Sequence, residues 1–288
     1  MENILSYGFM QRALVAGLAV AVTCAILGLF LILRKDAMIG HGLAHVTFGG
    51  VALGLFLKVS PILAAMAVSV LAALGILKLK EKAGLYEDTA LGIFSSVGMA
   101  VGIILVSLAG SFNVNLLSFL FGNILAIETF EVWLSLGLTA AVILTVSLCY
   151  HELVYLTFDP ESAATAGIKV KRLEAVLAVL SAVTVVLGMK VVGILLVAAL
   201  IVIPSAAGLM LAGSFRQAMV MSVFVAVISV FAGMLCAFYW DIPASGSIVI
   251  LNFSLFLLLF SVRIIKTRVI RSPNADHILT EHEPGVNK

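Results

Sequence analysis

Residues 13–33 read ALVAGLAVAVTCAILGLFLIL, an uncharged and almost wholly apolar run that ends at Arg34 and Lys35. A helix needs about 20 such residues to cross the hydrocarbon core of a bilayer. The run is too long for the hydrophobic part of a cleavable signal peptide, and no small-residue cleavage site follows it. It therefore predicts a transmembrane helix that is retained.

The composition of the whole chain is that of a membrane protein. Of its 288 residues, 62% are hydrophobic and 11% are charged, whereas soluble domains are roughly 45–50% apolar and about 25% charged. A globule of this size cannot hide so much apolar surface from water, so the surrounding solvent must be lipid. The 24 glycines agree, because small residues allow close helix packing in a bilayer. The net charge of +2 gives no reason to expect a nucleic-acid partner.

Nine stretches are long and apolar enough to be transmembrane helices. They are residues 13–33, 38–57, 61–77, 89–109, 131–150, 173–189, 191–212, 217–239 and 246–265. The apolar stretch 112–127 contains three asparagines and is compatible with a span, a re-entrant piece or an interfacial segment. The sequence predicts an all-α polytopic protein of about nine transmembrane helices, with a membrane domain over 1–266 and a polar, disordered cytoplasmic tail over 267–288.

The basic residues predict the orientation of these helices. With the N-terminus outside, all of the basic residues except Arg12, Lys58 and Lys190 fall on the cytoplasmic side. The opposite orientation reverses this ratio and would violate the rule that cytoplasmic loops are rich in Lys and Arg. We therefore expect the N-terminus outside and the C-terminus in the cytoplasm, which requires an odd number of spans.

The second predicted span carries two histidines that can act together. His41 and His45 are four residues apart, so they lie on one face of a helix. Gly49, Ala52 and Phe56 continue that face, which therefore suits a cavity between helices better than lipid. Ionisable groups at this depth are costly and usually mark a pathway. Neutral imidazole binds zinc and other late first-row metals well, so the pair predicts a metal site, although two buried histidines could instead bond to neighbouring helices.

The loop after the fifth predicted span has the features of a short helix. Asp159 is a good N-cap, Pro160 suits the first helical position, and Gly167 can close the C-terminal end. Glu161 suits the positive end of the helix dipole. These residues predict a short cytoplasmic helix at about 159–167, which on its own could be a simple connector.

The chain contains no motif for ATP binding or catalysis. Neither G-x-x-x-x-G-K-[ST], H-E-x-x-H nor G-x-S-x-G occurs in it. We therefore expect no enzyme activity in this chain. Any energy taken from ATP must come through a partner subunit.

The membrane portion, roughly residues 9–266, resembles the permease subunits of ABC importers for zinc, manganese or iron. The matching pieces, in chain order, are FMQRA (9–13), GLFLILR (28–34), the segment 40–52, EDTALGI (87–93), FGNIL (121–125), FDPE (158–161) with Ala163 and Gly167, GILL (193–196) with Ile203 and Pro204, and DIPA (241–244) with Gly246. No single piece is decisive, but their order along the chain makes the resemblance specific.

The resemblance implies a homodimer in the cytoplasmic membrane of a prokaryote, surrounded by lipid, that moves a divalent metal by alternating access. A pair of ATP-binding subunits would bind below, and an extracytoplasmic metal-binding protein would dock above. The part that resembles the coupling helix, which seats in each ATPase subunit, consists of Phe158, Asp159, Pro160, Glu161, Ala163 and Gly167. No permanently bound cofactor is implied.

The resemblance also bears on the choice of metal. In this family the second span usually carries an Asp followed four residues later by a His, and the pair is implicated in metal coordination. His45 matches the His, whereas His41 stands where Asp is usual. Because imidazole replaces a hard oxygen ligand, this departure favours zinc over manganese or iron, and it also makes a two-histidine site a departure from the family pattern.

Three further residues are candidates for roles in transport. Pro204 removes a helix hydrogen bond inside the seventh predicted span, so we expect a kink in the translocation path there. Asp241 and Pro243 lie in the predicted external loop before the last span, where they could meet the docking protein or form a plain polar turn.

Two other classes of protein stay open at this point. A stand-alone ion-coupled secondary transporter would work without an ATPase and usually shows an internal repeat, of which none is evident by eye. A haem-binding redox subunit would use His41 and His45 as ligands. Two histidines at this spacing on one helix cannot occupy both axial positions of one haem, so further ligands would be needed.

Overall fold

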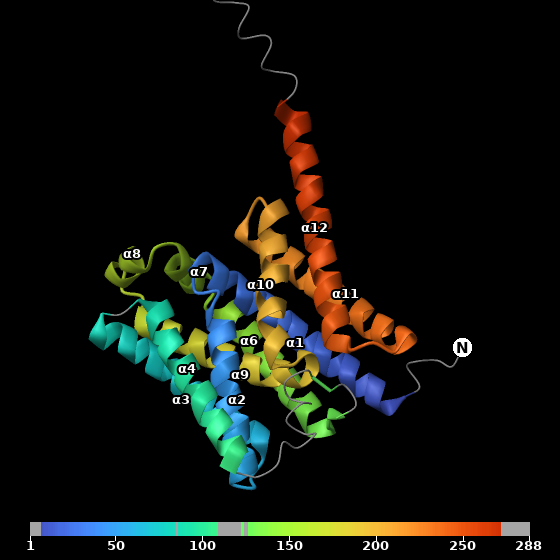
Figure 1. Cartoon of the computed structure of the whole chain (residues 1–288). Helices are drawn as coiled ribbons and strands as arrows, with labels where there is room; N and C mark the ends of the chain where they lie inside the picture. The colour runs from blue at the N-terminus through green and yellow to red at the C-terminus, as the bar shows by residue number, and fades with distance from the viewer. Residues whose placement is uncertain (1–6, 85, 109–121, 124–125, 272–288) are drawn as a thin grey trace, which may run out of the picture.

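The computed structural model of the chain describes residues 7–84, 86–108, 122–123 and 126–271, and these residues fold into a bundle of helices (Figure 1). No strand occurs within these ranges. The helices, in chain order, are α1 (Gly8–Leu33), α2 (Ile39–Phe56), α3 (Pro61–Ala83), α4 (Glu87–Leu108), α6 (Thr129–Leu148), α7 (Tyr150–Phe158), α8 (Pro160–Thr165), α9 (Val170–Val192), α10 (Ile194–Leu211), α11 (Phe215–Trp240) and α12 (Ala244–Arg271).

The helices confirm the polytopic membrane fold that the sequence predicts. Eight helices of the described chain are long and apolar enough to cross a membrane, and a shorter apolar helix, Val197–Leu211 within α10, is a ninth candidate. All nine predicted spans coincide with these helices, with ends that differ by a few residues. The stretch 112–127 falls mostly outside the described residues.

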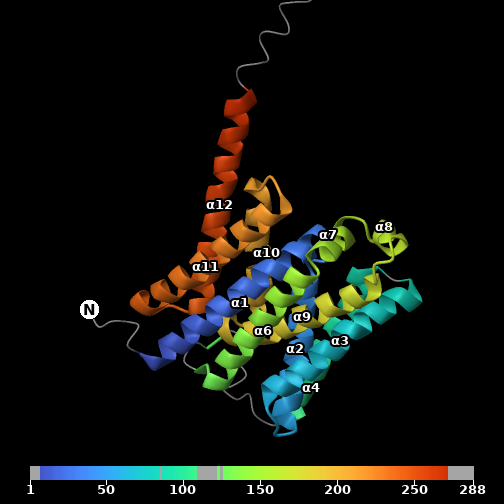
Figure 2. The same ribbon diagram turned by 180° about the vertical axis from the view of Figure 1, so that it is seen from behind.

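The bundle has a buried centre and an exposed periphery. The first span is 78% buried, and α1 packs against α6, α9, α10 and α11. Figure 2 shows α1 and α6 lying side by side across the middle of the molecule. By contrast, the span of α12 is only 11% buried, and α12 points away from the bundle for much of its length (Figure 1). In a membrane protein such exposed apolar faces are available to lipid or to another chain.

The helix ends define two poles of the bundle. At one pole, which we call the α8 end, Arg34 after α1 contacts Glu174 in the first turns of α9. At the opposite end, Tyr7 before α1 packs against Phe238 near the end of α11, with ring centroids 6.1 Å apart. Because α12 follows α11 back across the bundle, α1 begins at one pole and α12 ends toward the other. An odd number of membrane spans, such as nine, requires the two ends of the chain to lie at opposite poles.

Glycines allow a close helix contact between α2 and α4. A Cβ atom on Gly49 would lie 2.5 Å from the backbone oxygen of Gly98, and one on Gly98 would lie 2.7 Å from the Cα atom of Val46. Real Cβ atoms do not approach so closely, so only glycine permits the two backbones to meet here. This contact fixes the position of α2, which carries the histidine pair.

Two expectations from the sequence are wrong in detail. The chain between the fifth span and the short 159–167 helix is helical rather than a loop, because α7 covers Tyr150–Phe158. The last helix continues to Arg271, so the polar tail does not begin unstructured at 267. A polar sequence can extend a membrane helix beyond the apolar core, since the helix satisfies its own backbone hydrogen bonds. Residues 272–288 lie outside the described part of the chain.

Candidate metal site and candidate coupling helix

The two histidines of α2 face each other. Their Nε2 atoms are 3.2 Å apart, and the ring planes are nearly perpendicular, at 87°. The contact can serve as an N–H···N hydrogen bond with either ring as donor. It also has the spacing of two ligands on one metal, because tetrahedral zinc with Zn–N bonds of about 2.0–2.1 Å holds its nitrogen ligands about 3.3–3.4 Å apart. Two nitrogens at this distance could supply half of a tetrahedral donor set.

The described part of the chain does not complete that set. It contains no group of three or more His, Cys, Asp or Glu side chains that could hold a metal ion. His41 is exposed on the surface of the isolated chain, and His45 is half-buried, with a buried Nδ1 atom that has no hydrogen-bond partner among the described residues. The remaining ligands must come from outside this set, and the exposed edge at His41 leaves room for them.

The rest of the predicted histidine face turns toward neighbouring helices. Gly49 is buried against the backbone of Gly98. It also lines a cavity of about 320 Å³ between α2, α3 and α4, which agrees with the expected cavity between helices. Ala52 is 2% exposed and does not line this cavity, whereas the two histidines and Phe56 remain accessible.

The short helix at 159–167 forms as α8. Asp159 is its N-cap, and the carboxylate accepts a 2.9 Å hydrogen bond from the backbone N–H of Ser162. Hydrogen bonds from the Ser162 hydroxyl and then from the Ser162 N–H hold the pKa of the Asp159 carboxyl below its ordinary value. Gly167 adopts a φ of 86°, which closes the helix in the left-handed region. Phe158, Asp159, Pro160 and Glu161 are exposed, as a docking segment must be, whereas Ala163 is buried.

An aromatic cluster connects this segment to the bundle. The ring of Phe215, at the start of α11, lies 6.3 Å from that of Phe158, 6.0 Å from that of Tyr150 and 5.2 Å from that of Phe30. These are centroid distances typical of tilted and edge-to-face aromatic packing. Phe158, the last residue of α7, thus contacts the start of α11, which in turn packs against Phe30 near the end of α1.

An ionic cluster lies at the same pole. The Arg34 Nε atom is 3.1 Å from an oxygen of Asp36, and its Nη2 atom is 2.7 Å from an oxygen of Glu174. Burial lowers the pKa of the Arg34 guanidinium, but the charges of Glu174 and then Asp36 outweigh this effect, so the pKa is raised and the group stays charged. The cluster joins the turn between α1 and α2 to α9.

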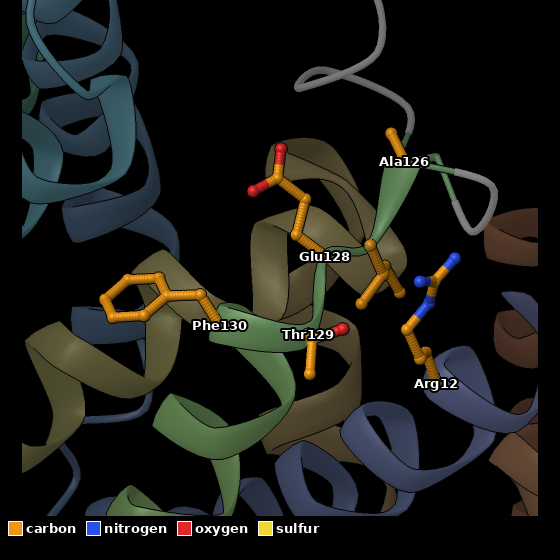
Figure 3. Close-up of a pocket in the computed structure, with 6 residues that line it drawn as sticks. Arg12, Ala126, Glu128, Thr129 and Phe130 are labelled. Atoms are coloured by element: carbon orange, nitrogen blue, oxygen red, sulfur yellow. The ribbon is translucent and has the colours of Figure 1, made fainter.

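The opposite pole carries the other candidate residues. A cavity of about 600 Å³ is lined by Arg12 from α1 and by the segment around Glu128 and Phe130 that leads into α6. Figure 3 shows these side chains. In the first turn of α6, the buried Glu131 forms a 3.0 Å ion pair with Lys190 of α9. Asp241 and Pro243 are also exposed at this pole, between α11 and α12, which places them where a docking protein could reach them.

Pro204 lies buried inside α10, and the helix continues on both sides of it. The neighbouring Ser205 hydroxyl donates to the carbonyl oxygens of Ile201 and Ala25, at 2.9 and 3.2 Å. These contacts tie the proline turn to α1. A role for Pro204 in the translocation path stays a prediction.

Two groups of residues at the poles were not found by reading the sequence. Arg34 and Glu174 are 140 residues apart in the chain, so their pairing carries no local pattern. The Glu131–Lys190 pair is hidden for the same reason. The only sign of these ion pairs in the sequence is an ionisable residue at the end of an apolar stretch. Many such residues form no ion pair, so the sign is not specific.

A many-helix membrane bundle with a paired imidazole site on one helix and a capped, exposed helix at one pole defines a membrane-spanning transport subunit. The chain belongs to the ABC 3 transport family, whose model matches residues 6–263. It is thus a multi-pass permease of the ABC type, as the resemblance implies.

Individual relatives agree with this assignment. The chain is 32% identical over 259 residues to the manganese transport system membrane protein MntC of Halalkalibacterium halodurans, which covers 90% of this chain and 89% of the relative. It is also 32% identical over 247 residues to the high-affinity zinc uptake system membrane protein ZnuB of Haemophilus influenzae, covering 85% and 94%. Among solved structures, PsaBC from Streptococcus pneumoniae in complex with Fab matches with a TM-score of 0.80 and 30% identity, over 89% of this chain and 92% of the other.

Proposed function

We propose that this chain is the membrane-spanning subunit of an ABC importer that carries a divalent metal ion, with zinc as the physiological substrate, and that a separate ATPase subunit powers it. The main observation behind this proposal is that the Nε2 atoms of His41 and His45 lie 3.2 Å apart, a distance that two ligands of one metal ion can have. Relatives named for manganese and zinc transport support a divalent metal as the substrate class. Two imidazole ligands favour zinc within that class, because manganese prefers oxygen.

A second copy of the chain supplies the missing ligands in this proposal. Each chain offers two nitrogen atoms, and a two-fold axis beside the exposed His41 would bring two such pairs together. Four nitrogens complete the tetrahedral set that zinc takes. The metal is then held at the subunit boundary, where a small movement of either copy opens the site and releases it.

The two poles receive different partners. The exposed residues Phe158 to Glu161 at the start of α8 dock on the ATPase subunit, and the pole with Asp241 and Pro243 receives an extracytoplasmic metal-binding protein. The membrane domain ends with α12, and the chain beyond it forms a cytoplasmic tail. A stand-alone transporter is not favoured, since the family is an ABC transport family. A haem subunit is not favoured either, because axial haem ligands approach iron from opposite faces, whereas these two nitrogens meet directly.

The test is metal uptake by cells or vesicles that carry single-histidine variants. We expect His45→Ala and His41→Ala to abolish most zinc uptake while the protein still assembles in the membrane. His151→Ala is the matched control, because His151 is exposed on α7, where its ring lies 5.5 Å from that of Tyr150. Zinc uptake by His45→Ala at the level of the unmodified protein would rule the proposal out.

A further inference from the structure

We propose that the ionic cluster of Arg34, Asp36 and Glu174 is a positioning device that transmits movement of α8 to the histidine helix α2. This inference rests on the proposed function, in which the ATPase acts on α8 and the metal binds on α2. In this inference, three residues outside the metal site connect α8 to α2. The steps of the connection can be followed along hydrogen bonds and ion pairs.

The first step runs from α8 to α9 through a fixed elbow. The backbone N–H of Ala166 donates to Ser162, that of Gly167 donates to Ala164, and that of Ile168 donates to Ala163, at 3.0, 3.1 and 3.1 Å. Ala166, Gly167 and Ile168 are therefore tied to α8, and the backbone N–H of Val170 donates to the Ile168 carbonyl oxygen at 2.8 Å. Because these hydrogen bonds hold the turn, a displacement of α8 moves the first turns of α9 with it.

The second step crosses from α9 to the turn before α2. Glu174 lies in the second turn of α9 and binds the Arg34 guanidinium, which at the same time binds Asp36. The Arg34 and Asp36 side chains are each 11% exposed and that of Glu174 is 24% exposed, so solvent screens the contacts far less than at the surface. A partly buried charge that loses its partner is costly, so the three groups move together rather than apart.

The third step leads from the turn to the metal site. The backbone N–H of Asp36 donates to Leu31 and that of Ile39 donates to Asp36, at 2.8 and 3.0 Å, so the turn is rigid. Ile39 is the first residue of α2, and His41 follows two residues later. A shift of Asp36 therefore changes the position of the His41 ring, which lies at the exposed edge of the site.

The geometry of α9 supports a transmitting role over a purely local clamp. Its other end is held by the Lys190–Glu131 ion pair, which anchors it to α6 at the opposite pole. α9 is therefore anchored near Lys190, while its N-terminal end, which follows α8, is tied to Arg34 through Glu174. A movement of α8 would turn α9 about the Lys190 end and displace Glu174. The second terminal nitrogen of Arg34 is buried and has no hydrogen-bond partner among the described residues, so it is free to take a new partner when the cluster shifts.

A neighbouring ion pair provides a matched control. Lys171 and Glu81 also join α9 to another helix, α3, at the same pole. Their side chains are 78% and 56% exposed, so solvent screens this pair, and neither residue contacts Arg34 or Asp36 in the turn before α2. Glu81→Gln removes one carboxylate charge near the start of α9, as Glu174→Gln does, but leaves the connection to α2 intact.

The experiment measures how much zinc is moved per ATP hydrolysed by the transporter assembled from this chain and its ATPase subunit in liposomes. For Glu174→Gln we expect retained assembly, a lower melting temperature because Arg34 loses one charged partner, retained ATP hydrolysis, and a zinc-to-ATP ratio lowered about fivefold or more, the range of typical coupling between sites. Glu81→Gln keeps the ratio of the unmodified protein. Glu174→Asp keeps the negative charge, so we expect its zinc-to-ATP ratio to fall less than that of Glu174→Gln. It is also the variant to measure if Glu174→Gln does not assemble.

The outcomes separate this inference from the proposed function. If the unmodified complex moves zinc and Glu174→Gln keeps its zinc-to-ATP ratio, only the inference is overturned. A parallel loss of transport and ATP hydrolysis would also overturn it, because that is the result of a merely structural contact. If the unmodified complex moves no zinc, the proposed function falls and the inference falls with it.

Discussion

At the scale of single residues, the proposed preference for zinc depends on His41. Its Nε2 atom lies 3.2 Å from that of His45, so both rings present the same nitrogen to one point. We expect His41→Asp, which replaces the imidazole by a carboxylate, to shift the preference between zinc and manganese about tenfold toward manganese, since manganese favours oxygen ligands. Competitive uptake of the two metals by cells measures the shift.

His151→Asp is the control for that substitution, because it places the same carboxylate on α7, away from the pair. It should leave the preference unchanged. An unaltered preference in His41→Asp would show that His41 is not a ligand. The site would then rest on His45 and on groups from another chain.

Asp159 gives a pH dependence at the same scale. Its pKa is lowered in the folded chain by the hydrogen bonds from Ser162, so its stabilising effect is fully present above the ordinary value of 3.8 and is lost as the pH falls through the lower folded value. We expect the Ser162 amide to exchange its hydrogen faster, relative to Asp159→Asn, when the pH is lowered from about 5 to about 3. Hydrogen exchange of the peptide that contains α8 measures this.

The Asn variant is a suitable reference because its side chain caps a helix without titrating. Comparison at equal pH also removes the intrinsic pH dependence of exchange. A constant ratio between the two proteins across this interval would contradict the N-cap role of the carboxylate.

Residues that act through a local pattern could be predicted from the sequence. The i, i+4 spacing of His41 and His45 places them on one helix face, and the order Asp159, Pro160 and Gly167 marks the start and end of a helix. The contact between Arg34 and Glu174 could not be predicted, because it depends on how α1 and α9 meet. No local property of either residue carries that information.

At the scale of helices, the contact between α2 and α4 is sensitive to substitution. A Cβ atom on Gly98 would lie 2.7 Å from the Cα atom of Val46, which cannot move without its whole helix. We expect Gly98→Ala to destabilise the protein by about 1–3 kcal/mol, the usual cost of overpacking. Because α2 would shift, zinc uptake should fall as well. Thermal unfolding in detergent and uptake in cells measure the two effects.

Gly92 is the matched control on the same helix, because a Cβ atom there meets nothing within 4 Å. Gly92→Ala should be neutral or stabilising, by up to about 1 kcal/mol, since alanine favours the helix. Equal unfolding temperatures for the two variants would show that α2 and α4 are not held at this distance in the membrane.

The positions of the helices were predictable because about 20 apolar residues are needed for every crossing, and this requirement is read directly from the sequence. α7 was missed for the converse reason. It has only nine residues, and a helix of that length carries no comparable length signal. The sequence predicted that the face of Gly49 turns toward other helices, but not that α4 covers it, because a helical face shows only which residues are neighbours on one helix.

At the scale of the whole molecule, the structure gathers the basic residues at one pole. Arg34 and Lys171 lie at the α8 end, in contact with Glu174 and Glu81. The predicted outer pole has few positive charges, and the Lys190 charge there is offset by the ion pair with Glu131. This asymmetry supports the predicted orientation, with the α8 end in the cytoplasm, because positive charge retained inside sets the topology.

The orientation can be measured with single cysteines in a variant that lacks Cys24, Cys149 and Cys236. We expect Lys58→Cys in intact cells to react with a thiol reagent that cannot cross the membrane, because this turn follows α2 at the outer pole. Lys171→Cys should react only after permeabilisation, because it lies at the start of α9 beside α8. The reverse pattern would place α8 outside, where no ATPase could reach it. The proposed coupling through α8 would then be wrong even though the bundle itself remained as described.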